Sequence, residues 1–460
     1  MLLAKKFRFG KLFYFKYYIK MIHPKVRRCE SLTSTRCEIS EPTLYSETGN
    51  NVEPYVIVMV GLPGRGKSYI SARLNRWLNW KGLKSKIFNL GDYRRTVYSG
   101  EEMNSEWFNP SNSEKRERLV DVAICDLKNW LLSQEGVVGI IDGTNSTVSR
   151  REHIKSLLSG LVEEDRILWI ENIVDSGEVV LENIRCTKLN NLDYSNKPES
   201  EAVKDFINRI TEYEKVYQKL ELDRDRAKHF VQMVNGKHML LNLICNQLDQ
   251  RLVYFLMNLH QKNIPLYLCR HGESTAQVKK IIGTDPELTE KGERFAGKLV
   301  EFIDNETSGH PQVNVFCSLL KRSLRTAKPF TDKARYNVKK WSELNEIYGG
   351  HFEGSTYAEI EEQWPKIFKL RQSDKYTYSW PGGESYRQMI GRLENIFLEI
   401  ERATQPLLII AHQGVCRGIY AYMMHMLPEH CTELDIDSHV VYKFTNRLNQ
   451  PVVESFKLTF

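Results

Sequence analysis

Short apolar runs alternate with amphipathic segments through the first half of the chain. Apolar runs lie at 55–60, 86–90, 137–141 and 166–170, and segments with helical periodicity lie between them at 69–80, 113–132 and 150–160. Continuous apolar runs of this length are typical of strands buried in a parallel sheet, and their alternation with helices indicates an α/β fold. From about 203 to 260 the pattern turns helical, and we expect a bridge between two domains there.

The same alternation returns after residue 260. Apolar runs at 264–269, 313–316 and 406–411 are separated by helical patterns at 290–304, 320–328 and 384–402. This pattern predicts a second α/β domain.

The length of the chain agrees with two domains. Its 460 residues exceed what one hydrophobic core usually supports, so we expect two domains of about 200 residues each. We place them at 53–260 and 261–460, each as a doubly wound α/β sheet. Residues 1–52 are expected to form a basic, largely disordered extension, because residues 23–52 show neither helical nor strand periodicity.

Charge is distributed unevenly along the chain. The net charge is +7, but residues 1–28 hold nine lysines or arginines and no acid, so the other 56 basic residues face 58 acidic ones. The folded part is therefore nearly neutral, and we expect no nucleic-acid partner. The basic, aromatic tail can touch an anionic membrane surface, but it lacks a clean amphipathic period, so we favour an accessory extension. Ser31, just after Arg27 and Arg28, is a candidate for phosphorylation.

Cysteine usage and hydropathy narrow the cellular setting. The nine cysteines include no CxxC pair and no nearby histidine at ligand spacing, which favours neither a disulfide framework nor a zinc site. No run of eighteen uncharged apolar residues is present, so we expect no transmembrane helix. Both observations favour a cytoplasmic protein.

A phosphate-binding loop follows the first apolar run. Its GxxxxGKS spacing sits between a predicted strand and a predicted helix, which is the context that this motif requires. Glycines let backbone N–H groups surround phosphate oxygens, the lysine adds a positive charge, and the serine hydroxyl is an Mg²⁺ ligand. We therefore predict an ATP site with Mg²⁺ at the residues Gly61, Leu62, Pro63, Gly64, Arg65, Gly66, Lys67 and Ser68.

An aspartate closes the third apolar run. Asp142 would lie at the carboxyl end of a strand, where doubly wound sheets carry their chemistry. It is our candidate for an Mg²⁺ ligand or a base, and the alternative is an aspartate that caps a helix. The polar turn after it suits a phosphorylated substrate that bears hydroxyl groups, and it contains Thr144, Asn145, Ser146, Thr147, Arg150 and Arg151.

Two histidines follow two apolar runs of the second half. His271 comes directly after 264–269 and Arg270, and His412 comes directly after 406–411. An imidazole can attack a phosphoryl group when guanidinium groups neutralise its oxygens and an acid protonates the leaving alcohol. Arg270 and Arg322 are the candidate clamps and Glu346 is the candidate acid. His412 taken alone is more typical of a hydrogen-bonded structural histidine, but the RHGE motif together with a second histidine at a strand end favours the catalytic interpretation.

These motifs resemble the family of bifunctional 6-phosphofructo-2-kinase/fructose-2,6-bisphosphatase enzymes over residues 53–445. The segments that carry the resemblance are GLPGRGKSYIS, FNLGDYRR, IIDGTNST, ENIRCTKL, NRITEYE, LCRHGES, LNEI, GGESY and AHQGVCR. The resemblance implies a P-loop kinase fused to a histidine phosphatase of the phosphoglycerate mutase type. It also implies synthesis and hydrolysis of fructose 2,6-bisphosphate, with ATP and fructose 6-phosphate as kinase substrates, no cofactor in the phosphatase domain, and a homodimer.

The resemblance also assigns binding residues. It implies that Asn183 and Lys188 hold ATP together with 61–68. It implies that fructose 6-phosphate meets Arg94, Arg116, Thr144, Arg150, Lys188, Arg209 and Tyr213. In the phosphatase half, with His271 as nucleophile and Glu346 as acid, it implies that the sugar phosphate meets Gln277, Gly283, Tyr357, Arg371, Lys375, Tyr386, Gln413 and Arg417.

The sequence departs from the family pattern at a few positions. Gln277 stands where the family usually has asparagine, 348–352 differs from the usual acidic, Cys-containing stretch, and Val174 stands where many members have cysteine. Two alternatives to a bifunctional enzyme therefore stay open. One is a 2-kinase with a weakened phosphatase domain, and the other is a catalytically silent scaffold that binds sugar phosphates.

Overall fold

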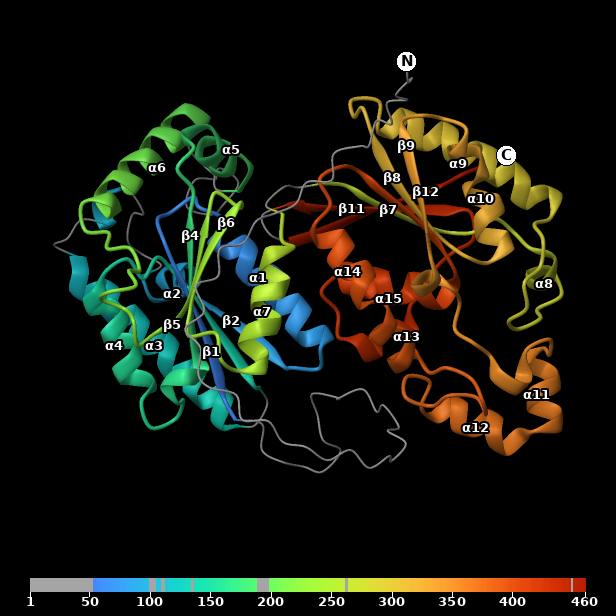
Figure 1. Ribbon diagram of the computed structural model, residues 1–460, viewed down its shortest axis with the longest axis horizontal. Helices are drawn as coiled ribbons and strands as arrows, with labels where there is room; N and C mark the ends of the chain where they lie inside the picture. Colours follow the sequence, from blue (N-terminus) through green and yellow to red (C-terminus); the bar gives the residue numbers. More distant parts are fainter. Residues whose placement is uncertain are drawn as a thin grey trace, which may run out of the picture. The chain divides into compact units, whose positions relative to one another are not determined.

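A computed structural model describes residues 53–98, 105–108, 112–133, 136–187, 198–260, 264–447 and 450–460. The predictions for the extension 1–52, including Ser31, and for Lys188 lie outside these residues. Residues 52–460 form one compact unit that contains two six-stranded sheets. In both sheets parallel strands alternate in sequence with helices (Figure 1), so the predicted α/β class is confirmed.

The first sheet has the strand order β2-β3-β1-β4-β5-β6. Its strands are β1 (Tyr55–Val60), β2 (Ser85–Asn89), β3 (Val138–Asp142), β4 (Ile167–Ile173), β5 (His229–Val234) and β6 (His238–Asn242). The central strands β1 and β3 are fully buried, as their uninterrupted apolar sequences require. Its helices are α1 (Lys67–Trp80), α2 (Leu90–Val97), α3 (Ser113–Leu132), α4 (Val148–Leu158), α5 (Gly177–Thr187), α6 (Glu199–Glu214) and α7 (Gln247–Met257).

One segment of the first half differs from the prediction. The helical interpretation of 203–260 is wrong, because β5 and β6 lie between α6 and α7. β5 pairs with β4 in parallel, and β6 returns antiparallel to β5 through a turn at Asn235 and Gly236, both with positive φ. The Asn-Gly dipeptide is the strongest local sign of such a hairpin, so this signal was available in the sequence.

The second sheet has the strand order β12-β11-β7-β10-β8-β9. Its strands are β7 (Leu266–Arg270), β8 (Val313–Ser318), β9 (Tyr336–Trp341), β10 (Leu407–Ala411), β11 (Val440–Arg447) and β12 (Gln450–Lys457). β11 runs antiparallel to both β7 and β12. The predicted runs 264–269, 313–316 and 406–411 correspond to β7, β8 and β10, whereas β9, β11 and β12 were not predicted.

Helices cover both faces of the second sheet. The described helices of the second half are α8 (Thr275–Val278), α9 (Glu290–Glu306), α10 (Lys321–Thr331), α11 (Tyr357–Gln363), α12 (Pro365–Ser373), α13 (Tyr386–Arg392), α14 (Glu394–Glu401) and α15 (Gln413–Met423). α9 and α10 contribute to one hydrophobic core, and α13, α14 and α15 contribute to the other. The predicted single helix 384–402 is two helices, because Leu393 ends α13 and begins α14.

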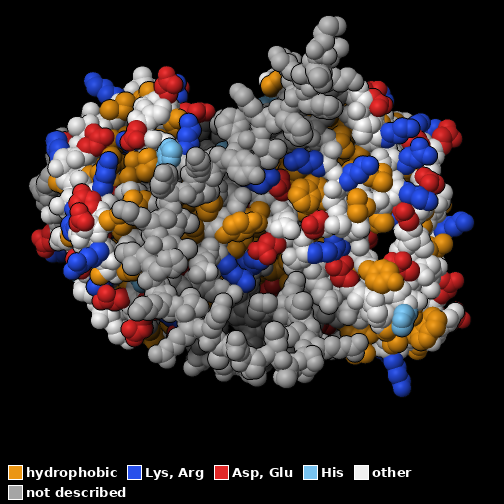
Figure 2. Space-filling model, in the orientation of Figure 1, with side chains coloured by type: hydrophobic (Ala, Val, Ile, Leu, Met, Phe, Trp, Pro, Cys, Tyr) orange, Lys and Arg blue, Asp and Glu red, His pale blue; other side chains and the backbone are white. Residues whose placement is uncertain are grey.

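The distribution of surface charge and the length of the helices bear on binding to a nucleic acid or a membrane. Basic and acidic side chains are interspersed on the face that Figure 2 shows. Among the helices that the structure describes, none has the length and apolar character that crossing a bilayer requires.

Candidate active sites

The loop between β1 and α1 has the backbone geometry of a phosphate cradle. Gly61, Gly64 and Gly66 have φ values of 131°, 73° and 78°, which residues with a Cβ rarely adopt. A Cβ on Gly61 would lie 2.7 Å from the carbonyl oxygen of Asn172. The predicted glycines are therefore required for the loop to curl over the first turn of α1.

Neighbouring side chains hold this loop in place. The buried Lys67 donates from Nζ to the carbonyl of Leu62 at 2.7 Å, and Asn183 donates to the carbonyl of Gly64 at 3.1 Å. Asn172 donates from Nδ2 to the carbonyl of Arg65. The loop is thus pre-formed, with its amides at the N-terminus of a 14-residue helix where anions bind.

Asp142 lies at the carboxyl end of β3, as predicted. It pairs in register with Asn89 of β2, whose side-chain N–H donates to Asp142 Oδ2 at 2.6 Å. The capping alternative for Asp142 is not supported, because Thr147 caps the following helix α4. The carboxylate of Asp142 and the hydroxyl of Ser68 are oxygen donors of the kind that Mg²⁺ prefers, so these two residues fit an Mg²⁺ site shared with substrate phosphates.

Arginines gather around Tyr213 and Phe108 in the first half. The guanidinium carbons of Arg209 and Arg94 lie 3.8 and 5.2 Å from the ring centre of Phe108, and that of Arg116 lies 5.6 Å from the ring centre of Tyr213. Burial alone raises the pKa of the Tyr213 hydroxyl, but Arg209, Arg116 and Thr144 together lower it below its ordinary value. Concentrated positive charge of this kind fits a phosphorylated ligand.

Arg150 is placed differently from the other predicted arginines. Its Nε donates to Glu117 at 2.7 Å, so its charge is already partly balanced. Thr144 accepts a backbone hydrogen bond of 2.9 Å from Gly61, which joins the predicted polar turn to the phosphate loop.

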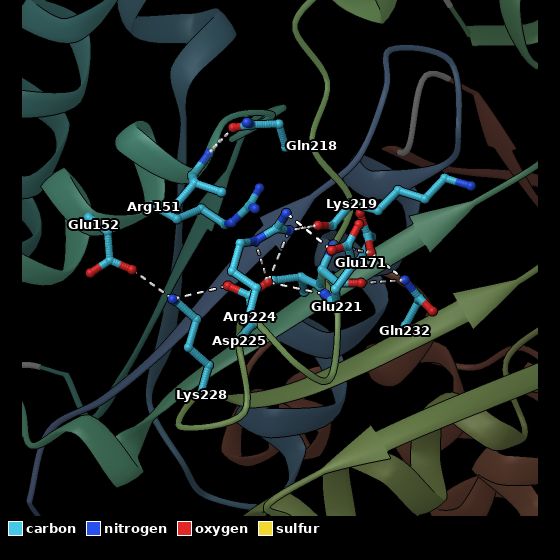
Figure 3. A network of polar contacts seen from close by, with 12 residues as sticks. Arg151, Glu152, Glu171, Gln218, Lys219, Glu221, Arg224, Asp225, Lys228 and Gln232 are labelled. Carbon is cyan, nitrogen blue, oxygen red and sulfur yellow. Dashed lines mark hydrogen bonds and ion pairs between the residues drawn. The ribbon is translucent and has the colours of Figure 1, made fainter.

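Polar side chains, several of them buried, lie next to this turn, and Figure 3 shows Arg151 among them. Arg151 is fully buried and donates to the carbonyl of Asn145 at 3.1 Å, while Asn145 donates to the carbonyl of Met59 in β1. Lys228 bridges Glu152 and Asp225 in the polar network of Figure 3. Arg151 and Asn145 were both predicted as members of the polar turn, but their role in holding this turn to β1 was not predicted.

Strand register brings the two predicted histidines together. Arg270 of β7 pairs with Ala411 of β10, so His271 and His412 leave the sheet side by side, with ring centres 4.9 Å apart. His271 Nδ1 lies 2.7 Å from the carbonyl of Gly272, and Arg322 Nε donates to His271 Nε2 at 3.0 Å. His271 therefore carries its proton on Nδ1 and presents the Nε2 lone pair.

The surroundings of the pair favour neutral imidazoles. Burial, followed by the positive charge of Arg322, lowers the pKa of His271 to about 3. Burial also lowers the pKa of His412 well below its ordinary value, with further contributions from His271 and Arg322. A neutral imidazole has the free lone pair that a nucleophile requires.

The predicted clamps and acid lie around the histidines. Arg322 also donates to the carbonyl of Thr284 at 2.9 Å, and Arg270 donates to the carbonyl of Ile436 at 3.1 Å. Glu346 accepts backbone N–H groups of Ile347 and Gly414 at 3.0 and 3.1 Å. A cleft of about 710 Å³ opens here, and Gly283, Arg322 and Glu346 are among its lining residues.

A second group of predicted residues is basic and aromatic. Arg417 donates to the hydroxyl of Tyr386 at 2.9 Å, and Arg371 donates to the carbonyl of Lys375 at 2.6 Å. Burial, then Arg417 and Arg371, lower the pKa of Lys375. Burial raises the pKa of Tyr386 to about 12, while Arg417 lowers it and Glu346 raises it. Tyr386 therefore lies close to Arg417 of this group and to Glu346 of the cleft, so both belong to one region.

The remaining predicted residues lie on the helices α8, α15 and α11. Gln277 in α8 donates to Ser438 Oγ at 2.8 Å, Gln413 is the first residue of α15, and the Tyr357 side chain is half exposed. Two further site residues were not predicted from the sequence: Ser318, whose Oγ lies 2.7 Å from His412 Nε2, and Asn89, which donates to Asp142. A polar residue at the end of an apolar run is the only signal that would have pointed to either.

Comparisons with known proteins match both halves. The 6-phosphofructo-2-kinase family model matches residues 44–263, and the model of the histidine phosphatase superfamily (branch 1) matches residues 266–459. The chain is 36% identical over 430 residues to "Fructose-2,6-bisphosphatase" of Saccharomyces cerevisiae, which covers 90% of this chain and 93% of that one. It is 38% identical over 398 residues to "6-phosphofructo-2-kinase/fructose-2,6-bisphosphatase 3" of Rattus norvegicus, with 85% and 70% covered. The chain therefore belongs to the 6-phosphofructo-2-kinase/fructose-2,6-bisphosphatase family.

Proposed function

We propose that this protein both makes and hydrolyses fructose 2,6-bisphosphate, and so controls the balance of glycolysis and gluconeogenesis. The observation that carries the proposal is the presence of two separate phosphate sites in one chain. A pre-formed phosphate loop with an arginine pocket lies in the first half, and a paired-histidine site lies in the second. We assign the kinase to 53–260 and the phosphatase to 261–460.

In the kinase half, the residues orient the two substrates. Amides of 61–68 and Lys67 bind the terminal phosphates of ATP, while the arginine pocket binds the 6-phosphate of fructose 6-phosphate. Asp142, oriented by Asn89, accepts the proton of the 2-hydroxyl as that oxygen attacks the γ-phosphorus. Ser68 and Asp142 would hold Mg²⁺, which would supply positive charge to neutralise the phosphates.

In the phosphatase half, the first step forms a phosphohistidine. The Nε2 lone pair of His271 attacks the phosphorus of the 2-phosphate, and the bond between that phosphorus and the sugar oxygen breaks. Arg270, Arg322 and His412 neutralise the transferring phosphoryl group. The protonated form of Glu346 gives its proton to the leaving oxygen, which releases fructose 6-phosphate.

The second step reverses the role of Glu346. Its carboxylate takes a proton from water, and the water oxygen attacks the phosphorus of the phosphohistidine. The bond between phosphorus and nitrogen breaks, inorganic phosphate leaves, and the Nε2 lone pair returns. We propose that this half uses no cofactor.

The proposal also covers the oligomeric state and the cellular location of the enzyme. We propose a homodimer in the cytoplasm. Six cysteines whose side chains the structure describes are free thiols, which supports a reducing compartment.

Both activities are tested on one preparation with two matched variants. Lys67→Ala should abolish synthesis of fructose 2,6-bisphosphate and leave its hydrolysis within about twofold of the unmodified protein. His271→Ala should do the reverse and remove the acid-labile phosphohistidine formed from bisphosphate labelled at the 2-phosphate. If the unmodified protein turns over neither substrate, the silent-scaffold alternative holds.

One observation favours the alternative of a 2-kinase with a weakened phosphatase domain. Gln277 replaces the asparagine usual in the family, and its amide is engaged with Ser438. If this reduces hydrolysis, Gln277→Asn should raise the phosphatase kcat while kinase activity stays constant. An unchanged kcat in that variant would remove the reason for this alternative.

A further inference from the structure

The two ring nitrogens of His412 have different surroundings. The side chain is fully buried, and its Nε2 lies 2.7 Å from the hydroxyl oxygen of Ser318. Nδ1 is also buried, and among the described residues it has no hydrogen-bond partner. A buried polar atom without a partner in the ligand-free protein is unusual, so a partner supplied by the substrate is a natural explanation.

Strand register places Ser318 beside His412. Cys317 of β8 pairs with Ile410 of β10, so the next residues along these parallel strands, Ser318 and Ala411, are neighbours at the sheet edge. Ser318 is the last residue of β8 and is itself fully buried. Its position is therefore fixed by the sheet rather than by a loop.

The proton of the Ser318 hydroxyl has one acceptor. Ser318 Oγ accepts the backbone N–H of Leu320 at 3.3 Å, and this bond uses a lone pair and not the proton. The nearby Ser323 hydroxyl donates to the carbonyl of Ile410 and accepts the N–H of Ser318. Among the described residues, the hydroxyl of Ser318 makes its only other hydrogen bond with His412 Nε2.

We propose that Ser318 sets the tautomer of His412: its hydroxyl donates to Nε2, so the ring keeps its proton on Nδ1 and offers that N–H to the transferring phosphoryl group. The proposal rests on the phosphatase function proposed above. The opposite tautomer would leave a buried hydroxyl proton without an acceptor and a buried Nδ1 lone pair without a donor. Ser318 is a positioning residue, since it acts through His412.

The two imidazoles then have opposite tautomers with complementary tasks. His271 holds its proton on Nδ1 against the carbonyl of Gly272 and presents a lone pair from Nε2. His412 presents a proton to the same phosphoryl group, where a second lone pair would repel the oxygens. A donor held in place before charge develops on these oxygens lowers the barrier of the chemical step.

Kinetics of serine variants test the proposal. Ser318→Ala should lower the phosphatase kcat about 10- to 100-fold, less than the roughly 10²- to 10³-fold loss expected when a whole donor is deleted, with KM nearly unchanged. Ser318→Thr keeps the hydroxyl and should retain most of the activity. Thr307→Ala is the matched control, because it removes a buried hydroxyl of the same half whose hydrogen bonds go to Ile303 and Arg335 and not to Ser318 or His412. Kinase activity of the same chains reports on folding.

The tautomer itself can be observed without turnover. Two-bond ¹⁵N–¹H couplings distinguish the two neutral tautomers, and a His412→Gln variant assigns the signals in the full chain. We expect the Nδ1–H form in the unmodified protein and a mixed or Nε2–H form in Ser318→Ala. An Nε2–H form in the unmodified protein, or full kcat in Ser318→Ala, overturns the proposal. A missing phosphatase function would appear differently, as no hydrolysis by the unmodified protein.

Discussion

His271 shows how burial prepares a single residue for catalysis. Its pKa is lowered to about 3 by burial and by Arg322, whereas a histidine in an unfolded chain titrates near 6.5. The folded protein therefore keeps the neutral nucleophile as the pH falls, and the unfolded chain binds the extra proton. The proton taken up on unfolding links this pKa to stability.

This linkage predicts a pH dependence with a definite sign. Stability associated with the lowered pKa is fully present above about pH 6.5 and is lost as the pH falls towards 3. Between pH 7 and pH 5 the free energy of unfolding should fall by about 2 kcal/mol through His271 alone. Denaturant unfolding at both pH values measures it, and His271→Gln should show a correspondingly smaller loss. An equal loss in both proteins would contradict the lowered pKa.

Gly61 carries a second prediction at the residue scale. Its φ of 131° and the carbonyl of Asn172, 2.7 Å from a Cβ placed there, leave no room for alanine. Gly61→Ala should therefore distort the loop and reduce kinase kcat/KM for ATP by at least about tenfold, as small displacements of positioning groups can cost this much or more. Gly177→Ala, where a Cβ meets nothing within 4 Å, should change little. Steady-state kinetics with varied ATP give the comparison.

The sequence identified the residues whose roles need only a local motif. Lys67 and His271 lie in short signatures whose spacing itself describes the chemistry. Asn89 and Ser318 act through hydrogen bonds to neighbouring strands, at register positions opposite Asp142 and Ala411. Strand order and register arise from tertiary packing, so a single sequence gives no direct access to these contacts.

At the scale of elements, Asn89 joins helix α2 to the kinase site. Its Oδ1 accepts the N–H groups of Gly91 and Asp92 and caps the helix, while its Nδ2 donates to Asp142. One side chain thus begins α2 and orients the carboxylate on the neighbouring strand. The two tasks depend on different atoms and can be separated by substitution.

Two substitutions at Asn89 should separate its effect on stability from its effect on the kinase kcat. Asn89→Asp keeps an oxygen for the cap, so stability should change by less than about 1 kcal/mol from the cap, but it places a second carboxylate beside Asp142. Asn89→Ala removes the cap, at a cost of about 1 kcal/mol, without adding charge. We expect the lower kinase kcat in Asn89→Asp. Thermal unfolding and kinase assays of both variants decide, and similar kcat values would argue against the orienting role.

Two of the strands missed from the sequence lie at sheet edges. β6 and β9 are edge strands whose side chains are mostly exposed or half-exposed, so no continuous buried run marks them. Central strands such as β1 and β10 are fully buried and therefore gave clear apolar runs. β5 and β11 also lie inside their sheets, but their sequences mix apolar with polar residues, so the search for continuous apolar runs did not find them.

At the scale of the whole molecule, helix α1 connects the kinase loop to the phosphatase half. It begins at Lys67, and its later residues Arg73 and Arg76 pair with the buried carboxylate of Glu401 in α14. The hydroxyl of Tyr422 in α15 donates to the same carboxylate at 2.6 Å. Burial alone raises the pKa of Glu401, but the two arginines and Tyr422 lower it below its ordinary value.

Removing the charge of Glu401 should therefore weaken the junction between the halves. Glu401→Gln leaves two buried guanidinium groups without a counter-charge, and breaking a buried ion pair in this way costs about 3–5 kcal/mol. Glu394→Gln is the matched control on the same helix, because its pair with Lys81 is partly exposed and should contribute less than about 1 kcal/mol. We expect both activities to be lost together on heating in the control. In Glu401→Gln the two activities should be lost at lower and separate temperatures, because each half then unfolds without the support of the other. Equal stability of the two variants would mean that the junction does not depend on this ion network.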